Sequence, residues 1–415
     1  MKRIDILSLL VALLLASPVL AENGINSPYT RYGFGQLSAM ETGANKGMGG
    51  TGIGVHNRNQ INMLNPASYA AVDTLTFLLD VGVSLNNTNF AQDGVRMNSR
   101  NTTFDYLVMQ FRLAPRLGMT IGLTPFSNIG YDFGETKTIL NDENNQVTAT
   151  NRYNGIGGLR QVTVGVGYMP FKGLAVGANL SYVYGEIYHY IYNQYSDTNV
   201  SPRTKQYRSD ITTYNAELGI QYQAIIGKSK LALGAIYQPG HGIDDVAYVI
   251  QTMGEVNDTT AAYNTLGMPS TYGVGISYSY DERLTVAADY SLQRYGDVEF
   301  FGDKGINRYC ASIGMEYIPE LITRNLFRRA RYRAGLHYAT AYYSVEGKPG
   351  PTEYGATVGV GLPIMNRWNG KSVINISGQY IHVRPNTPGM IVENTLRLNI
   401  GLSLNETWFN KWMVQ

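Results

Sequence analysis

A glycine-rich run near the N-terminus is the first candidate for chemistry. Gly47-Met48-Gly49-Gly50-Thr51-Gly52 matches the dinucleotide-binding spacing GxGxxG. That motif binds a pyrophosphate only when a strand precedes the glycines and a helix follows them. The residues around the run predict neither element, so the run gives no reason to expect a nucleotide cofactor.

Two further segments are similar to phosphate-binding loops but lack a required glycine. Gly227-Lys228-Ser229 and Gly370-Lys371-Ser372 would each need a glycine five positions earlier, where Tyr222 and Met365 stand. The five histidines show no metal-ligand spacing, and no GxSxG motif occurs. We therefore expect no enzyme, no cofactor and no metal site.

The composition narrows the class of protein. Of 415 residues, 46 are Gly and 32 are Tyr, only 15% are charged, and the net charge is +2. A nucleic-acid partner would call for a clear basic excess, and a disordered chain would have few aromatic residues. Only one apolar run approaches the length of a membrane-spanning helix, and it lies at the N-terminus. A transmembrane β-barrel fits better, because its apolar residues alternate with polar ones instead of clustering.

Residues 1–21 have the pattern of a secretory signal peptide. Lys2 and Arg3 precede an apolar core, and the small residue Ala21 ends a predicted cleavage site. Cys310 is the single cysteine, which excludes an intramolecular disulfide. We expect an exported chain, cleaved after Ala21, that is integral to the outer membrane of a Gram-negative bacterium.

Most of the remaining chain alternates between large apolar and small or polar residues. The last such segment has Leu396, Leu398, Ile400 and Leu402 on one set of positions, and a period of two places them on one face of a strand. Fourteen segments begin near residues 74, 101, 116, 156, 174, 207, 230, 271, 284, 304, 329, 352, 372 and 393. The prediction is an all-β fold: a 14-stranded antiparallel transmembrane β-barrel over residues 74–406, with a C-terminal tail at 407–415.

The connections between these segments are alternately short and long. Short turns are expected at 114–115, 169–173, 226–229 and 281–283, and long extracellular loops at 136–155, 188–206 and 239–270. One turn, 318–329, is longer than the other short ones and carries arginines. The outward face near strand ends carries an expected aromatic girdle of Tyr168, Tyr182, Tyr184, Tyr222, Tyr237, Tyr317, Tyr338 and Tyr380.

Residues 22–73 do not alternate and need another location. They hold five glycines between positions 47 and 54, followed by Asn65-Pro66-Ala67. A barrel of fourteen strands has a lumen too wide to be filled by side chains alone. We therefore expect residues 22–73 to plug the lumen. The inward-facing glycines that would admit plug backbone are Gly165, Gly167, Gly177, Gly219, Gly234, Gly273, Gly275, Gly335, Gly359 and Gly361.

These motifs together resemble the FadL family of outer-membrane transporters for long-chain fatty acids and other hydrophobic compounds. The resemblance rests on the run Gly47–Gly54, on Asn65-Pro66-Ala67 before the first strand, and on the hairpin around Tyr272 and Tyr290. The segments Ser27–Gly35 and Leu404–Phe409 are similar to a Bacteroidota branch of that family.

The resemblance implies a mechanism. Its hatch would contain Gly47, Gly49, Gly50, Gly52, Asn65, Pro66 and Ala67, and a hydrophobic ligand would pass through the barrel and leave sideways at a kink in the third strand. In this chain the third strand reaches Pro125 and Phe126, and proline cannot donate to the ladder. A kink is therefore expected there, although Pro125 would equally well end a strand or mark a bulge. No local motif identifies ligand-binding residues.

Two functions from different classes follow. The first is passive uptake of hydrophobic, fatty-acid-like small molecules. The second is a non-transporting barrel subunit of an outer-membrane protein assembly or secretion machine, with other barrels and lipoproteins as partners and with the arginine-rich turn at 324–333 as a docking surface. Inward charges either line a path or pair across the lumen, and we favour pairing because an unpaired buried charge is costly. These charges are Asp80, Arg112, Arg160, Glu217, Asp289, Glu316, Arg331, Arg333 and Arg397.

Overall fold

The structure of this protein is a computed structural model. It describes residues 24–407 except 75, 143–144, 198, 254–255, 264–265, 301–302, 346 and 365–370. The predicted signal peptide and residues 408–415 of the predicted tail lie outside the described residues. No helix within the described ranges is long and apolar enough to cross a membrane.

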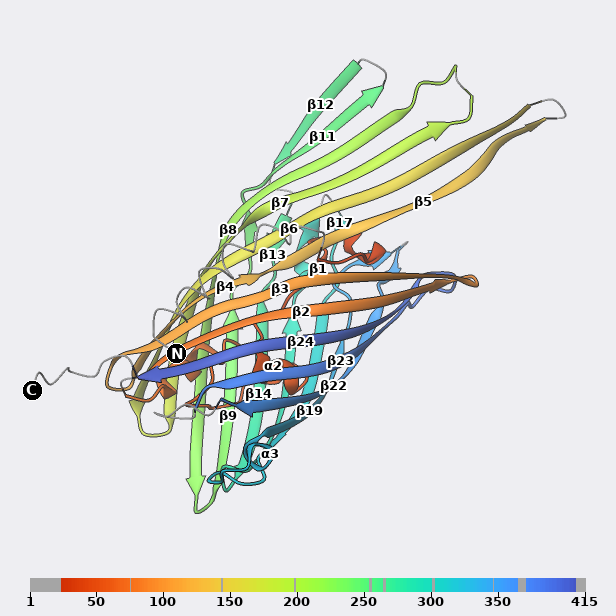
Figure 1. The fold of residues 1–415 in the computed structure, drawn as a ribbon. Helices are drawn as coiled ribbons and strands as arrows, with labels where there is room; N and C mark the ends of the chain where they lie inside the picture. Colours follow the sequence, from red (N-terminus) through yellow and green to blue (C-terminus); the bar gives the residue numbers. More distant parts are fainter. Residues whose placement is uncertain are drawn as a thin grey trace, which may run out of the picture.

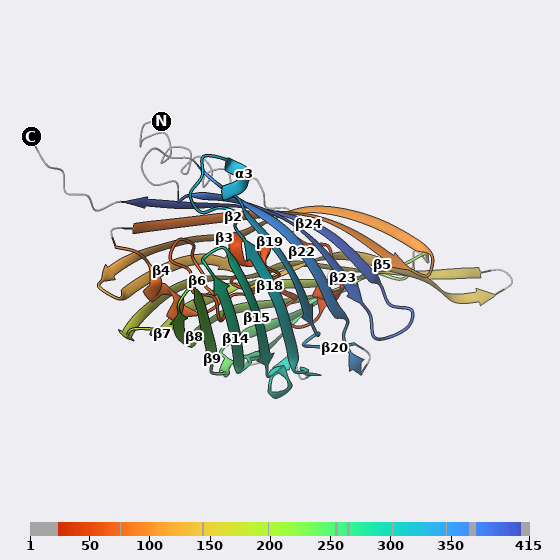
Figure 2. The same cartoon turned by 90° about the horizontal axis from the view of Figure 1, so that it is seen from below.

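Fourteen antiparallel strands form a closed barrel, as the alternation predicts (Figures 1 and 2). The ring closes where the first of these strands pairs with the last, from Thr76 opposite Thr407 to Ala91 opposite Val392. In order around the ring, the strands are β2(Thr76–Gln92), β3(Val95–Ala114), β4(Leu117–Pro125), β6(Asn145–Phe171), β7(Leu174–Tyr195), β8(Arg203–Ile226), β9(Ser229–Gln238), β14(Thr271–Tyr280), β15(Leu284–Gln293), β18(Arg308–Tyr317), β19(Arg331–Ala339), β22(Thr352–Pro363), β23(Val373–Arg384) and β24(Val392–Thr407).

Further strands extend the barrel at the end opposite the short turns, which is the extracellular end in barrels of this type. There β5(Ser127–Asp142) pairs with β6, and β11(Val246–Met253) pairs with both β8 and β12(Val256–Tyr263). The loops at this end hold three short pairs: β10(His241–Ile243) with β13(Leu266–Met268), β16(Glu299–Phe300) with β17(Asp303–Lys304), and β20(Ser344–Val345) with β21(Lys348–Pro349).

The prediction of long irregular loops at 136–155 and 188–206 is wrong. Most of these residues continue the β5–β6 and β7–β8 hairpins, so β6 and β8 begin at Asn145 and Arg203, earlier than predicted. β3 also begins earlier, at Val95, and most of the predicted loop 239–270 forms β10–β13. The backbone ladder continues beyond the membrane, where water contacts both faces of the sheet. Because neither face must be apolar there, the alternation that reveals a strand in the sequence is lost.

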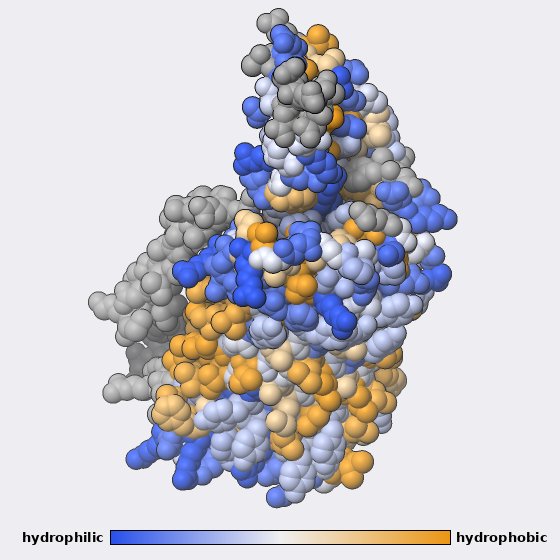
Figure 3. Space-filling model, turned by 90° about the vertical axis from the view of Figure 1, so that its right-hand side faces the viewer, coloured by the Kyte–Doolittle hydropathy of each residue, from blue (hydrophilic) through white to orange (hydrophobic). Residues whose placement is uncertain are grey.

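The outer surface has the polarity of a lipid-facing wall. In β14, Tyr272, Val274, Ile276 and Tyr278 are all exposed, while Gly273 and its inward neighbours are buried. On the face seen in Figure 3, apolar residues gather over the lower body of the barrel, and the extension above it is mainly hydrophilic. The eight tyrosines predicted for the girdle are all exposed, as expected.

If the outer face of the strands contacts lipid, a charged side chain placed on it should destabilise the barrel. Leu398 faces outward on β24 and is 40% exposed. Replacing it, in the variant Leu398→Arg, should lower the free energy of unfolding by about 2–4 kcal/mol, because the guanidinium would enter hydrocarbon. Urea unfolding in phospholipid vesicles measures this loss. The matched change Val95→Arg, near the tip of the β2–β3 hairpin, should have little effect, and equal losses at both sites would contradict the assignment.

Candidate functional site

Residues 24–74, here called the plug, occupy the barrel lumen. They form η2(Pro28–Arg31), β1(Gln36–Leu37), α2(Gly43–Gly47) and η3(Pro66–Ala71), which are joined by irregular segments. The plug meets the inward glycines of the wall, as the sequence predicts. A Cβ atom at Gly177, Gly219 or Gly335 would lie closer than 3.0 Å to plug atoms, so only glycine admits the plug at this depth.

The glycine run of the plug is bound to the wall by backbone hydrogen bonds. The amides of Gly52 and Ile53 donate to Oδ2 of Asp289 on β15, at 2.6 and 2.8 Å. Gly49 and Gly50 have φ angles of +67° and +82°, which favour glycine, and the Cα of Gly47 lies 3.2 Å from an ideal Cβ at Gly359. Two amides on one carboxylate show that this run contacts the barrel wall.

The Asn65-Pro66-Ala67 segment also contacts the barrel wall. The Asn65 side chain accepts a hydrogen bond from the Ala67 amide at 3.0 Å and so caps η3, with Pro66 at the first helical position. Its Nδ2 donates to the carbonyl oxygens of Ile53 at 3.0 Å and Ile220 at 3.2 Å. Asn65 therefore ties both predicted plug motifs to each other and to β8.

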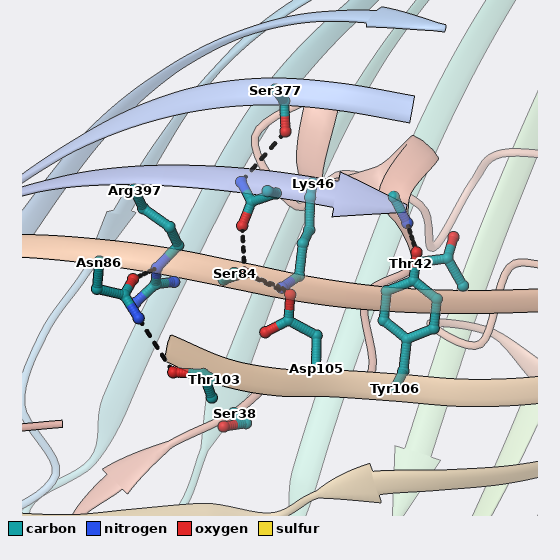
Figure 4. Close-up of polar contacts among 12 residues, drawn as sticks. Ser38, Thr42, Lys46, Ser84, Asn86, Thr103, Asp105, Tyr106, Ser377 and Arg397 are labelled. Carbon is teal, nitrogen blue, oxygen red and sulfur yellow. Dashed lines mark hydrogen bonds and ion pairs between the residues drawn. The ribbon is translucent and has the colours of Figure 1, made fainter. Parts of the chain in front are cut away.

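On β3, Asp105 and Tyr106 hold the plug helix α2 (Figure 4). Lys46 Nζ lies 2.7 Å from Asp105 Oδ2, and the Gly43 amide donates to the Tyr106 hydroxyl at 2.7 Å. That hydroxyl donates to Asp80 Oδ1 at 3.0 Å. The alternation of the sequence does not reveal Asp105, because this residue lies at a β-bulge where the register with β2 shifts and the alternation breaks.

A second charged group faces the plug from β18 and β19. Glu316 forms ion pairs with Arg333 at 2.7 Å and with Arg331 at 3.0 Å, and Arg333 also donates to Gln60 of the plug at 3.2 Å. For Glu316, Arg331 and Arg333 these pairs agree with the expectation that inward charges pair across the lumen or with the plug. Arg160, predicted to face inward, is instead exposed on β6 between the buried residues Leu159 and Gln161.

Burial also shifts the pKa of two titratable side chains of the plug, His56 and Tyr69. Burial lowers the pKa of His56 to about 4, so its imidazole is neutral at physiological pH. Burial raises the pKa of the Tyr69 hydroxyl well above its usual value. Both groups therefore lie against the wall uncharged near neutral pH.

The third wall strand is interrupted at Pro125. β4 ends at Pro125 and pairs with β3 only as far as Leu123, and β5 begins at Ser127. The register with β6 shifts by one residue across this break, from Pro125 opposite Arg160 to Ile129 opposite Gly157. Beyond the break, β5 diverges from β3 (Figure 1). Among the strand pairings of the described residues, the part of β3 from Val95 to Tyr106 pairs only with β2.

Plug segments line both edges of this gap. On the β5 edge, β1 pairs with Ser127 and Asn128, and the Ser38 amide donates to the Phe126 carbonyl at 2.9 Å. On the β3 edge, the Thr103 hydroxyl donates to the Gly24 carbonyl at 2.9 Å. The plug thus provides hydrogen-bond partners where the wall strands have separated.

A cavity of about 440 Å³ lies between the plug and the extracellular loops. Pro125, Phe126 and Thr103 line it, so it reaches both edges of the gap. Its lining is mixed: Met40 and Tyr343 contribute apolar surface, whereas Glu41, Arg308, His337, Glu353 and Arg397 are ionisable. The described residues contain no cluster of three or more His, Cys, Asp or Glu side chains suited to a metal ion.

An aromatic cluster formed by the plug and the extracellular loops adjoins the cavity, which Tyr295 and Tyr342 help to line. Phe34 of the plug packs edge-on against Phe300 at 5.2 Å, and Tyr295 packs against Tyr342 at 4.6 Å. The Tyr342 hydroxyl donates to the Gly35 carbonyl at 2.6 Å. Extracellular loops and plug therefore share one buried core.

Because the plug lies so close to the wall, a larger side chain at a contact glycine should displace the plug and change the conductance of the barrel. In Gly335→Val, the added side chain would overlap Met48 and Gly49 and displace the glycine run, so single-channel conductance in planar bilayers should rise. Gly378→Val is the control, because a Cβ there meets no atom within 4 Å. Equal conductance in both variants and the unsubstituted chain would mean that the glycine run does not obstruct the lumen.

Comparison with known proteins agrees with this geometry. The toluene transporter TodX of Pseudomonas putida is similar over 91% of this chain and 100% of its own, with 15% identity and a TM-score of 0.60. A FadL homologue of Pseudomonas aeruginosa matches 90% of this chain and 99% of its own, with 12% identity and a TM-score of 0.60. The toluene transporter TbuX of Ralstonia pickettii covers 88% of this chain and 97% of its own, with 15% identity and a TM-score of 0.59.

At these identities the likeness concerns the fold, and it confirms the FadL-like plugged barrel that the motifs predict. The Bacteroidota assignment stays a prediction. No curated protein matches the chain. The BamG family model matches residues 1–414, and the chain therefore belongs to the BamG family.

Proposed function

We propose that this protein is an outer-membrane channel for passive uptake of small hydrophobic molecules, which leave the lumen sideways through the gap between β3 and β5. The observation that carries this proposal is the break at Pro125 and Phe126, which lies beside the lumenal cavity. A ligand in the cavity would reach the lipid-facing wall without crossing the hydrogen-bonded ladder. No nucleotide-binding loop is expected from the sequence, so transport would follow the ligand gradient.

In this proposal the plug is a hatch. Gly47, Gly49, Gly50 and Gly52 hold it against the far wall, while residues 24–38 cover the edges of the gap. Opening the gap would require these first plug residues to shift, and with them the packing of Phe34 in the aromatic cluster. The similarity to two proteins described as toluene transporters supports a small hydrophobic ligand.

The gap proposal is tested by restoring the missing backbone donor. Pro125→Ala should favour continuous pairing of the third strand and lower uptake several-fold. Uptake of radiolabelled toluene and oleate is measured in cells that carry this barrel in place of their own FadL-type channel. Pro170→Ala, at the short-turn end of β6, is the control. If the unsubstituted barrel takes up neither probe above empty cells, or if Pro125→Ala takes up both normally, the lateral route is wrong.

A second candidate is a non-transporting subunit of an outer-membrane protein assembly or secretion machine. Two observations favour it: membership of the BamG family, and the ionisable lining of the cavity, which suits a hydrophobic ligand poorly. The hydrogen bonds and ion pairs between plug and wall would then keep the barrel permanently closed.

The second candidate is tested by purifying the protein from its native membrane in a mild detergent. As a subunit, it should co-purify in a constant ratio with another barrel or with lipoproteins, because a machine requires a stable contact between its parts. The complex mass and subunit ratio are measured by native mass spectrometry. Recovery as a single chain that carries extractable lipid would contradict this candidate and support uptake.

A further inference from the structure

The connection between β18 and β19 is longer than four other turns at its end of the barrel. Residues 318–330, here called the rim loop, include the short helix α3(Leu326–Arg329). Four other turns at this end, 115–116, 172–173, 227–228 and 281–283, have only two or three residues. At its start, Ile318 and Leu321 line a cavity of about 230 Å³ together with plug residues. The rest of the loop does not line that cavity, so its length needs another explanation.

The rim loop exposes large apolar side chains. Ile322 is 97% exposed and Phe327 is 68% exposed, and Leu321 and Leu326 are exposed as well. Single exposed apolar residues are ordinary, but four within seven residues form a patch, and such patches mark an interaction surface.

The patch adjoins the lipid-facing wall. Tyr332, an outward-facing residue on β19, donates from its hydroxyl to the Phe327 carbonyl at 3.1 Å. On the neighbouring strand, Ile313, Met315 and Tyr317 continue the exposed outer face toward the rim. The helix α3 therefore lies beside the outer surface of the barrel, at the level where an aromatic girdle meets lipid headgroups.

The charge of the rim loop suits that location. It carries Arg324, Arg328 and Arg329 against the single acidic residue Glu320. Arg328 pairs with Glu320 at 2.7 Å, whereas Arg324 is exposed and has no hydrogen bond or ion pair within the part of the chain that the structure describes. Guanidinium groups bind phosphate in a bidentate manner, and basic residues next to a bilayer attract anionic lipids.

We propose that the rim loop anchors this end of the barrel in the adjacent leaflet. Ile322 and Phe327 insert among the acyl chains, and Arg324, with its neighbouring arginines, binds the phosphates of anionic phospholipids. This anchoring requires only that the barrel spans a membrane. It holds whether the protein takes up small molecules or serves as a subunit.

Fluorescence quenching by brominated lipid tests the insertion. The variants F327W and I322W are reconstituted in vesicles whose phospholipids carry bromine on the acyl chains, and the emission of the three native tryptophans is subtracted using the unsubstituted chain. We expect quenching close to that of the lipid-facing variant Y332W. The variant V256W on the extracellular strand β12 should be nearly unquenched. If F327W and I322W behave like V256W, the patch faces water or a protein, and the proposal is wrong.

A second arm tests the headgroup contact. Quenching of F327W is compared between brominated phosphatidylglycerol and brominated phosphatidylcholine, and we expect a preference of about threefold or more for the anionic lipid. Neutralising the arginines in R324Q/R328Q/R329Q should bring this ratio to about one, because the charge attraction is then lost. Equal quenching by both lipids before neutralisation would overturn the preference for anionic phospholipids. Heat-modifiable migration on gels verifies that each variant is folded.

Discussion

The structure depends on one constraint: every backbone N–H and C=O group in the lipid layer must find a partner within the protein. Closing the sheet meets this constraint, and pairing of β2 with β24 over sixteen residue pairs removes the last open edge. Alternation of apolar and polar residues follows, because each strand then has one face in lipid and one in the lumen. The break between β4 and β5 departs from this rule, and there plug residues supply hydrogen bonds that the wall no longer makes.

Closure creates a second requirement, since a ring of fourteen strands leaves a wide interior. The chain fills it with its own N-terminal segment, and the plug comes close enough to the wall that glycines replace larger residues on the inward face. Polar groups buried by this packing need partners, because an unsatisfied buried group costs about 1–3 kcal/mol. Asp289 receives two plug amides, and Asn65 bridges two plug segments and a wall strand. Polar contacts thus fix the position of the plug, and glycines provide the space.

The same barrel is compatible with more than one activity, since function depends on the site and not on the fold. The similarity to toluene transporters covers almost the whole chain, at about 15% identity. The features that bear on the choice between uptake and a structural role lie in the lumen. The strand break and the adjoining cavity favour a lateral route, whereas Arg308, Glu353 and other ionisable residues in the lining favour a closed, polar interior.

The sequence by itself determined the barrel class, the strand number, the outward tyrosines and the plug, because lipid on one side imposes a period of two and glycine marks close backbone contact. It also predicted an irregularity at Pro125, because proline lacks an N–H, but it left open whether a kink, a strand end or a bulge would form there. Tertiary structure decided the rest. The extracellular hairpins stay paired where no apolar face reveals them, and the bulge at Asp105 turns that carboxylate toward Lys46 against the local alternation. The plug contacts join residues more than two hundred positions apart, such as Gly52 and Asp289. Such pairings follow from ring closure and cannot be read from local spacing.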